Sequence, residues 1–118
     1  MKGELAKQSI DFSIRIVAYY EWLIARKHEY IMSRQILRSG TSIGANIHES
    51  KFAASTADFK NKLRIAAKEA SETDYWLIVL ESTGYYHSDF DDLKPRVISI
   101  IKMLTATLKT LDDDIDIV

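Results

Sequence analysis

Apolar and small side chains recur along this chain at alternating steps of four and three residues, the spacing of one stripe on an α-helix. Polar or turn-forming breaks separate four such stretches, around Lys27 to Ile31, around Ala54-Ser55, and from Thr83-Gly84 through Ser88. The stripes consist of Leu5, Ser9, Phe12, Ile16, Tyr19 and Leu23; of Ile36, Gly40, Ile43, Ile47, Ser50 and Ala54; of Phe59, Leu63, Ala66, Ala70, Thr73, Leu77 and Leu80; and of Leu93, Val97, Ile100, Leu104, Leu108 and Leu111. No segment alternates with the period of two that a strand requires, so the pattern predicts four helices.

The connections between these helices are short, and short connections force successive helices to lie antiparallel. The sequence therefore predicts an all-α, antiparallel up-and-down four-helix bundle, with residues 1–118 as a single domain. Ser55 and Asp58 fit a capping box at the start of the third helix, and Gly84 suits the C-cap that ends it. Pro95 leaves two readings open. Either it lies two turns inside a helix capped by Ser88, or residues 89–93 form a separate turn before the main helix.

The composition narrows the class of protein. Of the 118 residues 47% are hydrophobic and 28% charged, and there are four Gly, one Pro and no Cys. This composition is typical of a folded domain and excludes disordered, collagen-like and disulfide-rich classes. Charged residues interrupt the first segment, and no stretch approaches the roughly 18 apolar residues of a membrane span. We therefore expect a cytoplasmic protein with no membrane segment.

The first helix has two apolar faces. At about 100 degrees per residue, Phe12, Ile16 and Tyr19 fall on one side of it, and a second apolar group gathers nearly opposite. That group consists of Ile10, Ile14, Val17 and Ile24. Each helix of a bundle buries one stripe in the core, so the second face is predicted to be an interface between copies of the chain. The alternative is a central first helix with wide contacts inside one chain.

Charge is unevenly distributed along a chain whose net charge is −1. From Arg26 to Lys68 there are nine basic residues against Glu29, Glu49 and Asp58, whereas the segment from Glu69 to Asp92 holds seven acids and no Lys or Arg. Opposite poles of this kind favour head-to-tail association, which closes into a ring when the rotation permits. Ordinary solvated helix faces, whose charges largely cancel after folding, are an equally open interpretation.

A polar flank runs beside the apolar stripe of the second helix, and acidic residues occupy a matching flank of the third. We expect the two flanks to meet, with Glu69 or Glu72 accepting hydrogen bonds from Arg38 or Asn46, because short polar residues inside helices need partners. The predicted polar network consists of Gln35, Arg38, Ser42, Asn46, Glu49, Glu69 and Glu72.

Catalytic and metal-binding motifs are missing. A di-iron bundle site needs Glu-x-x-His from two helices, but Glu69-Ala70-Ser71-Glu72 has no histidine, and His28, His48 and His87 stand alone. The chain has no Cys, no Gly-x-Ser-x-Gly elbow and no phosphate-binding glycine loop. The sequence thus predicts no catalytic residue, no metal site, no cofactor and no enzymatic activity.

Residues 34–77 carry motifs whose order and spacing resemble a known family. The motifs are Arg34-Gln35-Ile36-Leu37-Arg38; Thr41-Ser42-Ile43-Gly44-Ala45-Asn46-Ile47 with Glu49; Ser55 with Asp58-Phe59; Leu63, Ile65-Ala66 and Lys68-Glu69-Ala70; and Glu72-Thr73 with Tyr75-Trp76-Leu77. They resemble the 23S ribosomal RNA intervening sequence proteins, four-helix-bundle proteins whose usual Ala-Glu-Gly is replaced here by His48-Glu49-Ser50.

The resemblance implies a small bacterial protein that forms a homopentameric ring and has no associated catalytic activity. The family is similar to the accessory variability determinant protein of diversity-generating retroelements, which associates with nucleic acid and a reverse transcriptase. The positions that match the family are Gln35, Arg38, Ser42, Asn46, Glu49, Glu69, Glu72, Thr73, Tyr75 and Trp76.

Three hypotheses for function remain after this reading of the sequence. The first is a non-enzymatic oligomer that binds structured RNA or DNA, or a ribonucleoprotein, weakly and in a salt-sensitive way. We expect Lys60, Lys62 and Arg64 to make the contact, because they open the third helix beside a loop. The second hypothesis is a structural module whose partner is another protein. The third is an enzyme that uses Arg38, Glu69 and Glu72.

Overall fold

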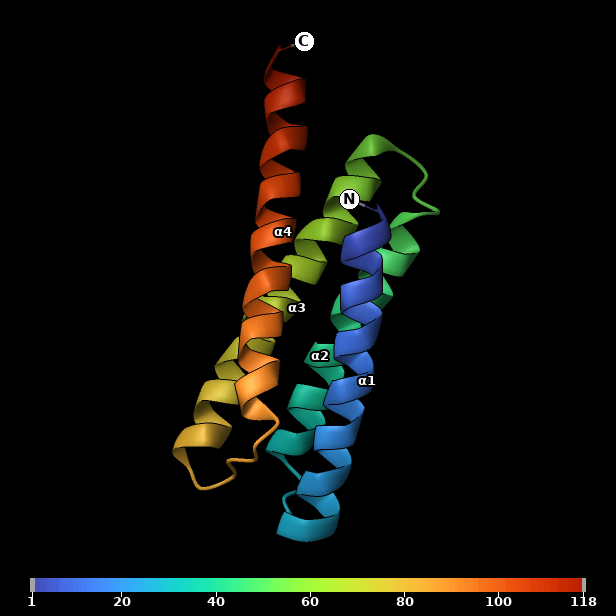
Figure 1. The fold of residues 1–118 in the computed structure, drawn as a ribbon. Coiled ribbons are helices and arrows are strands. Elements are labelled where there is room, and N and C mark those ends of the chain that lie inside the picture. Colours follow the sequence, from blue (N-terminus) through green and yellow to red (C-terminus); the bar gives the residue numbers. More distant parts are fainter. Residues whose placement is uncertain (1, 118) are drawn as a thin grey trace.

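Four long helices form the protein in the computed structural model, which describes the backbone of residues 2–117 and the side chains of residues 3–112. They are α1 (Lys2–Lys27), α2 (Met32–Ser50), α3 (Thr56–Ser82) and α4 (Phe90–Ile117). Successive helices run in opposite directions, and the chain passes from one end of the molecule to the other four times (Figure 1). The predicted four-helix bundle is therefore confirmed. Within the described residues, no helix has a stretch long and apolar enough to cross a membrane.

Side chains cap the starts of two helices. The carboxylate of Glu29 accepts hydrogen bonds from the backbone N–H groups of Ile31 (3.2 Å) and Ser33 (2.7 Å), which would otherwise be unpaired at the start of α2. At α3 the Ser55 Oγ accepts from the Asp58 N–H at 3.0 Å, and the Asp58 carboxylate accepts from the Ala54 N–H at 3.0 Å. The capping box predicted at Ser55 is thus present, with Asp58 bonding one residue further back than usual.

The bounds of the helices at the connections differ in part from those predicted from the sequence. The second helix ends at Ser50, and the apolar stripe continues to Ala54 only in sequence, because tight turns replace the helical bonds after Ser50. Gly84 follows α3 with φ +92°, the left-handed conformation that glycine adopts without strain. Pro95 lies inside α4, so the reading with a separate turn at residues 89–93 is wrong. Helical bonding is already established there, since the Leu93 N–H donates to the Asp89 carbonyl at 2.8 Å.

Each helix contacts its two neighbours around a square, and the backbones of diagonally opposite helices do not approach one another among the described residues. Every sequence stripe supplies fully buried side chains, among them Phe12, Ile43, Leu77 and Leu104. At Gly40 the α1 and α2 helices approach so closely that a side chain would press on Ile16. The result is an elongated bundle of 53 × 22 × 22 Å in which α4 projects past the end formed by the α2–α3 connection (Figure 1).

Candidate functional site

Arg38 on α2 bridges two carboxylates on α3. Its Nη1 donates to Glu69 Oε2 at 3.0 Å, and its Nη2 donates to Glu72 Oε2. The Trp76 indole N–H, one turn further along α3, donates to the same Glu72 oxygen at 3.1 Å. The polar flanks of α2 and α3 therefore meet within one chain, and these four side chains form what we call the Arg38 cluster.

The Arg38 cluster lies at the surface, because the Arg38 side chain is 51% exposed and those of Glu69 and Glu72 are 17% and 35% exposed. The hydrogen bond from Arg38, followed by that from Trp76, lowers the pKa of Glu72. The bond to Glu72 correspondingly raises the pKa of Arg38. Arg38 and Glu72 are therefore both charged at neutral pH, and the guanidinium already pairs with the two carboxylates that flank it.

The other members of the predicted polar network do not join the Arg38 cluster. The Asn46 Nδ2 donates to its own helix, to the Ser42 carbonyl at 2.8 Å and the Ser42 Oγ at 3.1 Å, because that carbonyl is one turn away. The expected bond from Asn46 to Glu69 or Glu72 is absent among the described contacts. Glu49 pairs instead with Lys62 at 3.1 Å. Gln35 lies exposed on the α2 surface.

The three cations expected to touch nucleic acid at the start of α3 are all engaged in ion pairs. Lys60 Nζ lies 2.8 Å from Asp112 Oδ1, and Arg64 Nη2 lies 3.2 Å from the same oxygen. Lys62 is the partner of Glu49. The Lys60 side chain is only 8% exposed, which corrects the expectation that it lies free on the surface. The stem is therefore shielded from solvent, while the head pairs with Asp112 of α4.

The second apolar face of α1 is exposed to solvent in a single chain. The side chains of Ile10, Ile14 and Val17 are 52%, 65% and 39% exposed, and Ile24 is half-buried. The opposite face of α1, with Phe12 and Ile16, is fully buried. The alternative of a central first helix with wide contacts inside one chain is therefore wrong for this part of α1.

Sequence reasoning missed a ring of four charges that joins α1 to α4. Asp11 contacts Arg15 at 3.0 Å and Arg96 at 2.9 Å, and Asp92 contacts the same two guanidiniums at 3.0 and 2.9 Å. The steps of four residues from Asp11 to Arg15 and from Asp92 to Arg96 are visible in the sequence and predict each helical pair. Only the packing of α1 on α4 shows that the two pairs close into one ring. Among the described residues, no group of His, Asp and Glu is arranged to hold a metal ion.

These features define an up-and-down four-helix bundle protein with a paired polar flank and one uncovered apolar face. Over residues 1–106 the chain matches the family described as 23S rRNA-intervening sequence protein, and it belongs to that family. The resemblance carried by residues 34–77 is thereby confirmed.

A solved structure supports the same assignment. The chain is similar to a protein with unknown function from the S23 ribosomal protein family of Bacteroides thetaiotaomicron, with 46% sequence identity and a TM-score of 0.88. The similarity covers 92% of this chain and 99% of the other. No curated protein matches the chain.

Proposed function

We propose that the protein is a non-enzymatic helical module that assembles with copies of itself and binds structured RNA or DNA. The observation that carries this proposal is a surplus of free cations. Of the nine basic residues from Arg26 to Lys68, four form ion pairs. The other five form no ion pair with any side chain that the structure describes, and they are Arg26, Lys27, Arg34, Lys51 and Lys68.

The three acids of the same segment do not balance this surplus. Glu49 is taken by Lys62. Glu29 is buried against the N–H groups that open α2, and Asp58 caps α3. Within this segment the cations without an ion pair outnumber the acids left unoccupied, and a surplus of this kind attracts phosphates by releasing their counterions.

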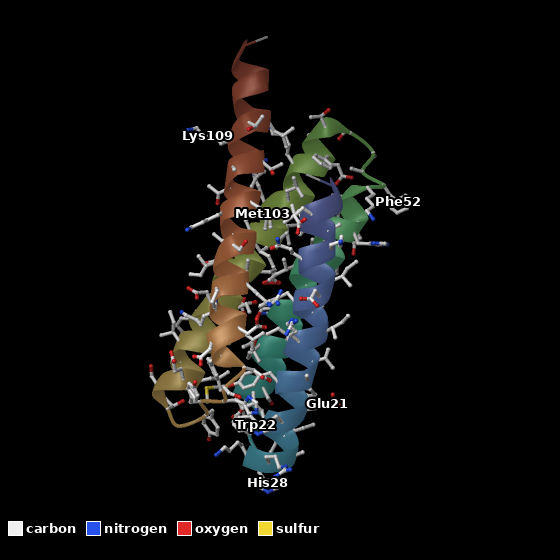
Figure 2. All side chains as sticks on the ribbon, viewed as in Figure 1. Glu21, Trp22, His28, Phe52, Met103 and Lys109 are labelled. Atoms are coloured by element: carbon white, nitrogen blue, oxygen red, sulfur yellow. The ribbon has the colours of Figure 1, made fainter. Side chains whose placement is uncertain are left out.

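The densest group of cations without an ion pair lies at the α1–α2 connection and not at the start of α3, and one of them, Lys27, places its Nζ over the Trp22 ring, 5.4 Å from the centroid. Arg26 and Lys27 end α1, and Arg34 lies in the first turn of α2. Tyr30 between them is 51% exposed and offers a ring on which a base can stack. Figure 2 shows this end of the bundle at His28, far from the connection that carries Phe52. We therefore assign the nucleic-acid contact to the α1–α2 connection.

Self-assembly is proposed through the exposed face of α1. A contiguous row of Ile10, Ile14 and Val17 in water is unfavourable, and a second copy is the partner always present at equal concentration. A homopentamer is the assembly that the family resemblance implies. A ring would repeat the basic end once per subunit and raise avidity without any new contact. The same face also favours the second candidate function, a module that binds another protein.

The Arg38 cluster supports a structural role over catalysis. The Arg38 guanidinium donates hydrogen bonds to the carboxylates of Glu69 and Glu72, and the Trp76 N–H donates a further hydrogen bond to Glu72. A catalytic acid or base needs a pKa near the operating pH, whereas the pKa of Glu72 is moved down and away from it.

Titration of a labelled RNA hairpin at several salt concentrations tests the proposed function. Neutralising Arg26, Lys27 and Arg34 together to Gln should weaken binding at least about 10-fold and reduce the salt slope by about one per lost phosphate contact. The matched control changes Lys7, Lys102 and Lys109 to Gln, which removes the same charge elsewhere. An equal loss of RNA binding in the two variants would mean that the RNA is attracted by the overall charge of the protein and not by the α1–α2 connection. Absence of binding at low salt would favour the protein-partner alternative.

A further inference from the structure

Two exposed stripes of side chains lie on opposite corners of the bundle, one on α1 and one on α3. The outer stripe of α1 follows the side of the helix away from the core and consists of Lys7, Ile10, Ile14, Val17 and Glu21. All five are exposed, and Glu21 lies at the outer edge of α1 (Figure 2). The backbones of α1 and α3 do not approach one another among the described residues, so the two stripes do not meet within one chain.

The outer stripe of α3 has the same order of charged and apolar residues. It consists of Lys68, Ser71, Tyr75, Ile78 and Glu81, which are all exposed. Tyr75 and Ile78 are 56% and 47% exposed, so this stripe also holds large apolar side chains in water. Each stripe begins with a lysine and ends with a glutamate. At about 1.5 Å per residue these ends are about 21 Å apart on α1 and about 20 Å apart on α3, so the two stripes match in length.

The charged ends of the stripes form no ion pair with any described side chain. They are Lys7, Glu21, Lys68 and Glu81. Neighbouring charges on the same helices are already paired within the chain. Asp11 and Arg15 belong to the ring of four charges that joins α1 to α4. Glu72 pairs with Arg38 of α2, and Asp74 pairs with α4. The four end charges are therefore available to a second molecule.

We propose that α1 of one copy of the chain packs antiparallel against α3 of the next copy, so that the two outer stripes cover each other. Because the order of charges is the same on both helices, antiparallel packing sets each lysine against a glutamate. Lys7 comes to lie beside the partner's Glu81, and Glu21 beside the partner's Lys68. A parallel arrangement would instead set like charges together at both ends of the contact.

The same register brings the apolar side chains of the two stripes together. Ile10 lies against the partner's Ile78, and Ile14 against the partner's Tyr75. Each of these four side chains is about half exposed or more in a single chain, and the contact removes them from water. A two-fold contact between two outer stripes of α1 would also pair lysine with glutamate. It would leave the apolar side chains of α3 exposed and the charges of α3 unpaired, so the α1–α3 contact covers more of the surface.

The proposed contact joins two different faces of the chain and is therefore heterologous. Each added copy leaves a new face open, so copies add until the rotation closes a ring. The contact rests on the self-assembly part of the proposed function and identifies the surface that receives α1. Arg26, Lys27 and Arg34 lie outside both outer stripes and remain available to nucleic acid.

Charge reversal, followed by sedimentation of the purified protein over a dilution series, distinguishes the two contacts. Glu21→Lys should raise the dissociation constant of the assembly at least about 5-fold, because a lysine then faces the partner's Lys68. Adding Lys68→Glu should restore the wild-type constant, since the pair is rebuilt with its signs exchanged. Adding Lys7→Glu instead should weaken the assembly further, because the new glutamate faces the partner's Glu81. Restoration by Lys7→Glu and not by Lys68→Glu would show a contact between two α1 helices and overturn the proposal.

Cross-linking between chains identifies the groups that meet. The chain has no Cys, so an Ile14→Cys protein and a Tyr75→Cys protein carry one thiol each. When the two are mixed and mildly oxidised, the mixed disulfide should form at least about 10-fold faster than between Ile14→Cys and Phe52→Cys. Phe52 is the matched control because its side chain is 80% exposed and lies outside both outer stripes.

The outcomes separate this contact from the proposed function. Equal rates of disulfide formation in the two mixtures would refute the contact, and so would an assembly that Glu21→Lys leaves unchanged. In both cases self-assembly itself would stand. A wild-type protein that is monomeric at every concentration would overturn the proposed self-assembly together with this contact.

Discussion

Replacement of Gly40 by Ala tests the close approach of α1 and α2, which sets the geometry of the bundle. Gly40 faces Ile16, a fully buried side chain. A methyl group on Gly40 would lie 2.9 Å from Ile16 Cγ2 and 3.0 Å from Cγ1. Carbon atoms that are not bonded to each other prefer about 3.5–4.0 Å. The added methyl therefore forces either Ile16 or one of the helices to move.

Two opposing terms decide the size of the effect. Ala is favoured over Gly inside a helix by about 0.8–1.0 kcal/mol, whereas overpacking a filled core costs about 1–3 kcal/mol. The atoms in the way are the branch carbons of Ile16, which stay close to the backbone and have one strongly preferred rotamer in a helix. Rotation offers little relief, so we expect the upper part of the range. Gly40→Ala should lower the free energy of unfolding by about 1–2 kcal/mol.

Urea unfolding at several protein concentrations measures this loss and separates it from any change in assembly. The matched control is Gly3→Ala, because the methyl that it adds meets no atom within 4 Å apart from its chain neighbours and the nearby backbone of its own helix. The control should be neutral or stabilising by up to about 1 kcal/mol. In a Gly40→Ala/Ile16→Ala double variant the new methyl occupies part of the space left by Ile16, so its loss should be smaller than the sum of the single losses. A Gly40→Ala protein as stable as the Gly3→Ala control would refute the close approach.

Three further predictions concern polar contacts. A double-mutant cycle between Arg38 and Glu72 should give a coupling of about 0–1 kcal/mol, because the guanidinium is half exposed. The hydrogen bond from Arg38 lowers the pKa of Glu72 in the fold, so this coupling should be full at neutral pH and vanish as the pH falls through that lowered pKa. Asp112→Asn should destabilise the protein by leaving Lys60 without its carboxylate, whereas Lys60→Met should be neutral or stabilising, and thermal unfolding of both variants checks the contrast. Tyr19→Phe removes a hydrogen bond of 3.0 Å to the Tyr85 carbonyl and should cost about 0.5–1.5 kcal/mol in urea unfolding.

The four helices could be predicted from the sequence alone, because helical periodicity and capping depend only on residues that are close together in the chain. A helix repeats every 3.6 residues, so side chains such as Phe12 and Leu77 mark the buried stripe without knowledge of their partners. Capping at Ser55 and the left-handed residue Gly84 likewise depend on a few neighbours in the chain. The family followed from motifs within residues 34–77 for the same reason, since spacing is a property of sequence.

Only the tertiary structure decided which polar groups meet. Arg38 is separated from Glu72 by 34 positions, and Lys60 from Asp112 by more, so their pairing depends on how one helix is placed along another. Asn46 and Arg38 lie on the same flank of α2, so their spacing in the sequence does not tell which of them bonds to α3. The short Asn46 side chain bonds instead to the Ser42 carbonyl of its own helix. The packing of the helices also determines which charged groups find a partner and which apolar side chains remain exposed to water. The cations without an ion pair at the α1–α2 connection and the exposed Phe52 could therefore be identified only in the structure.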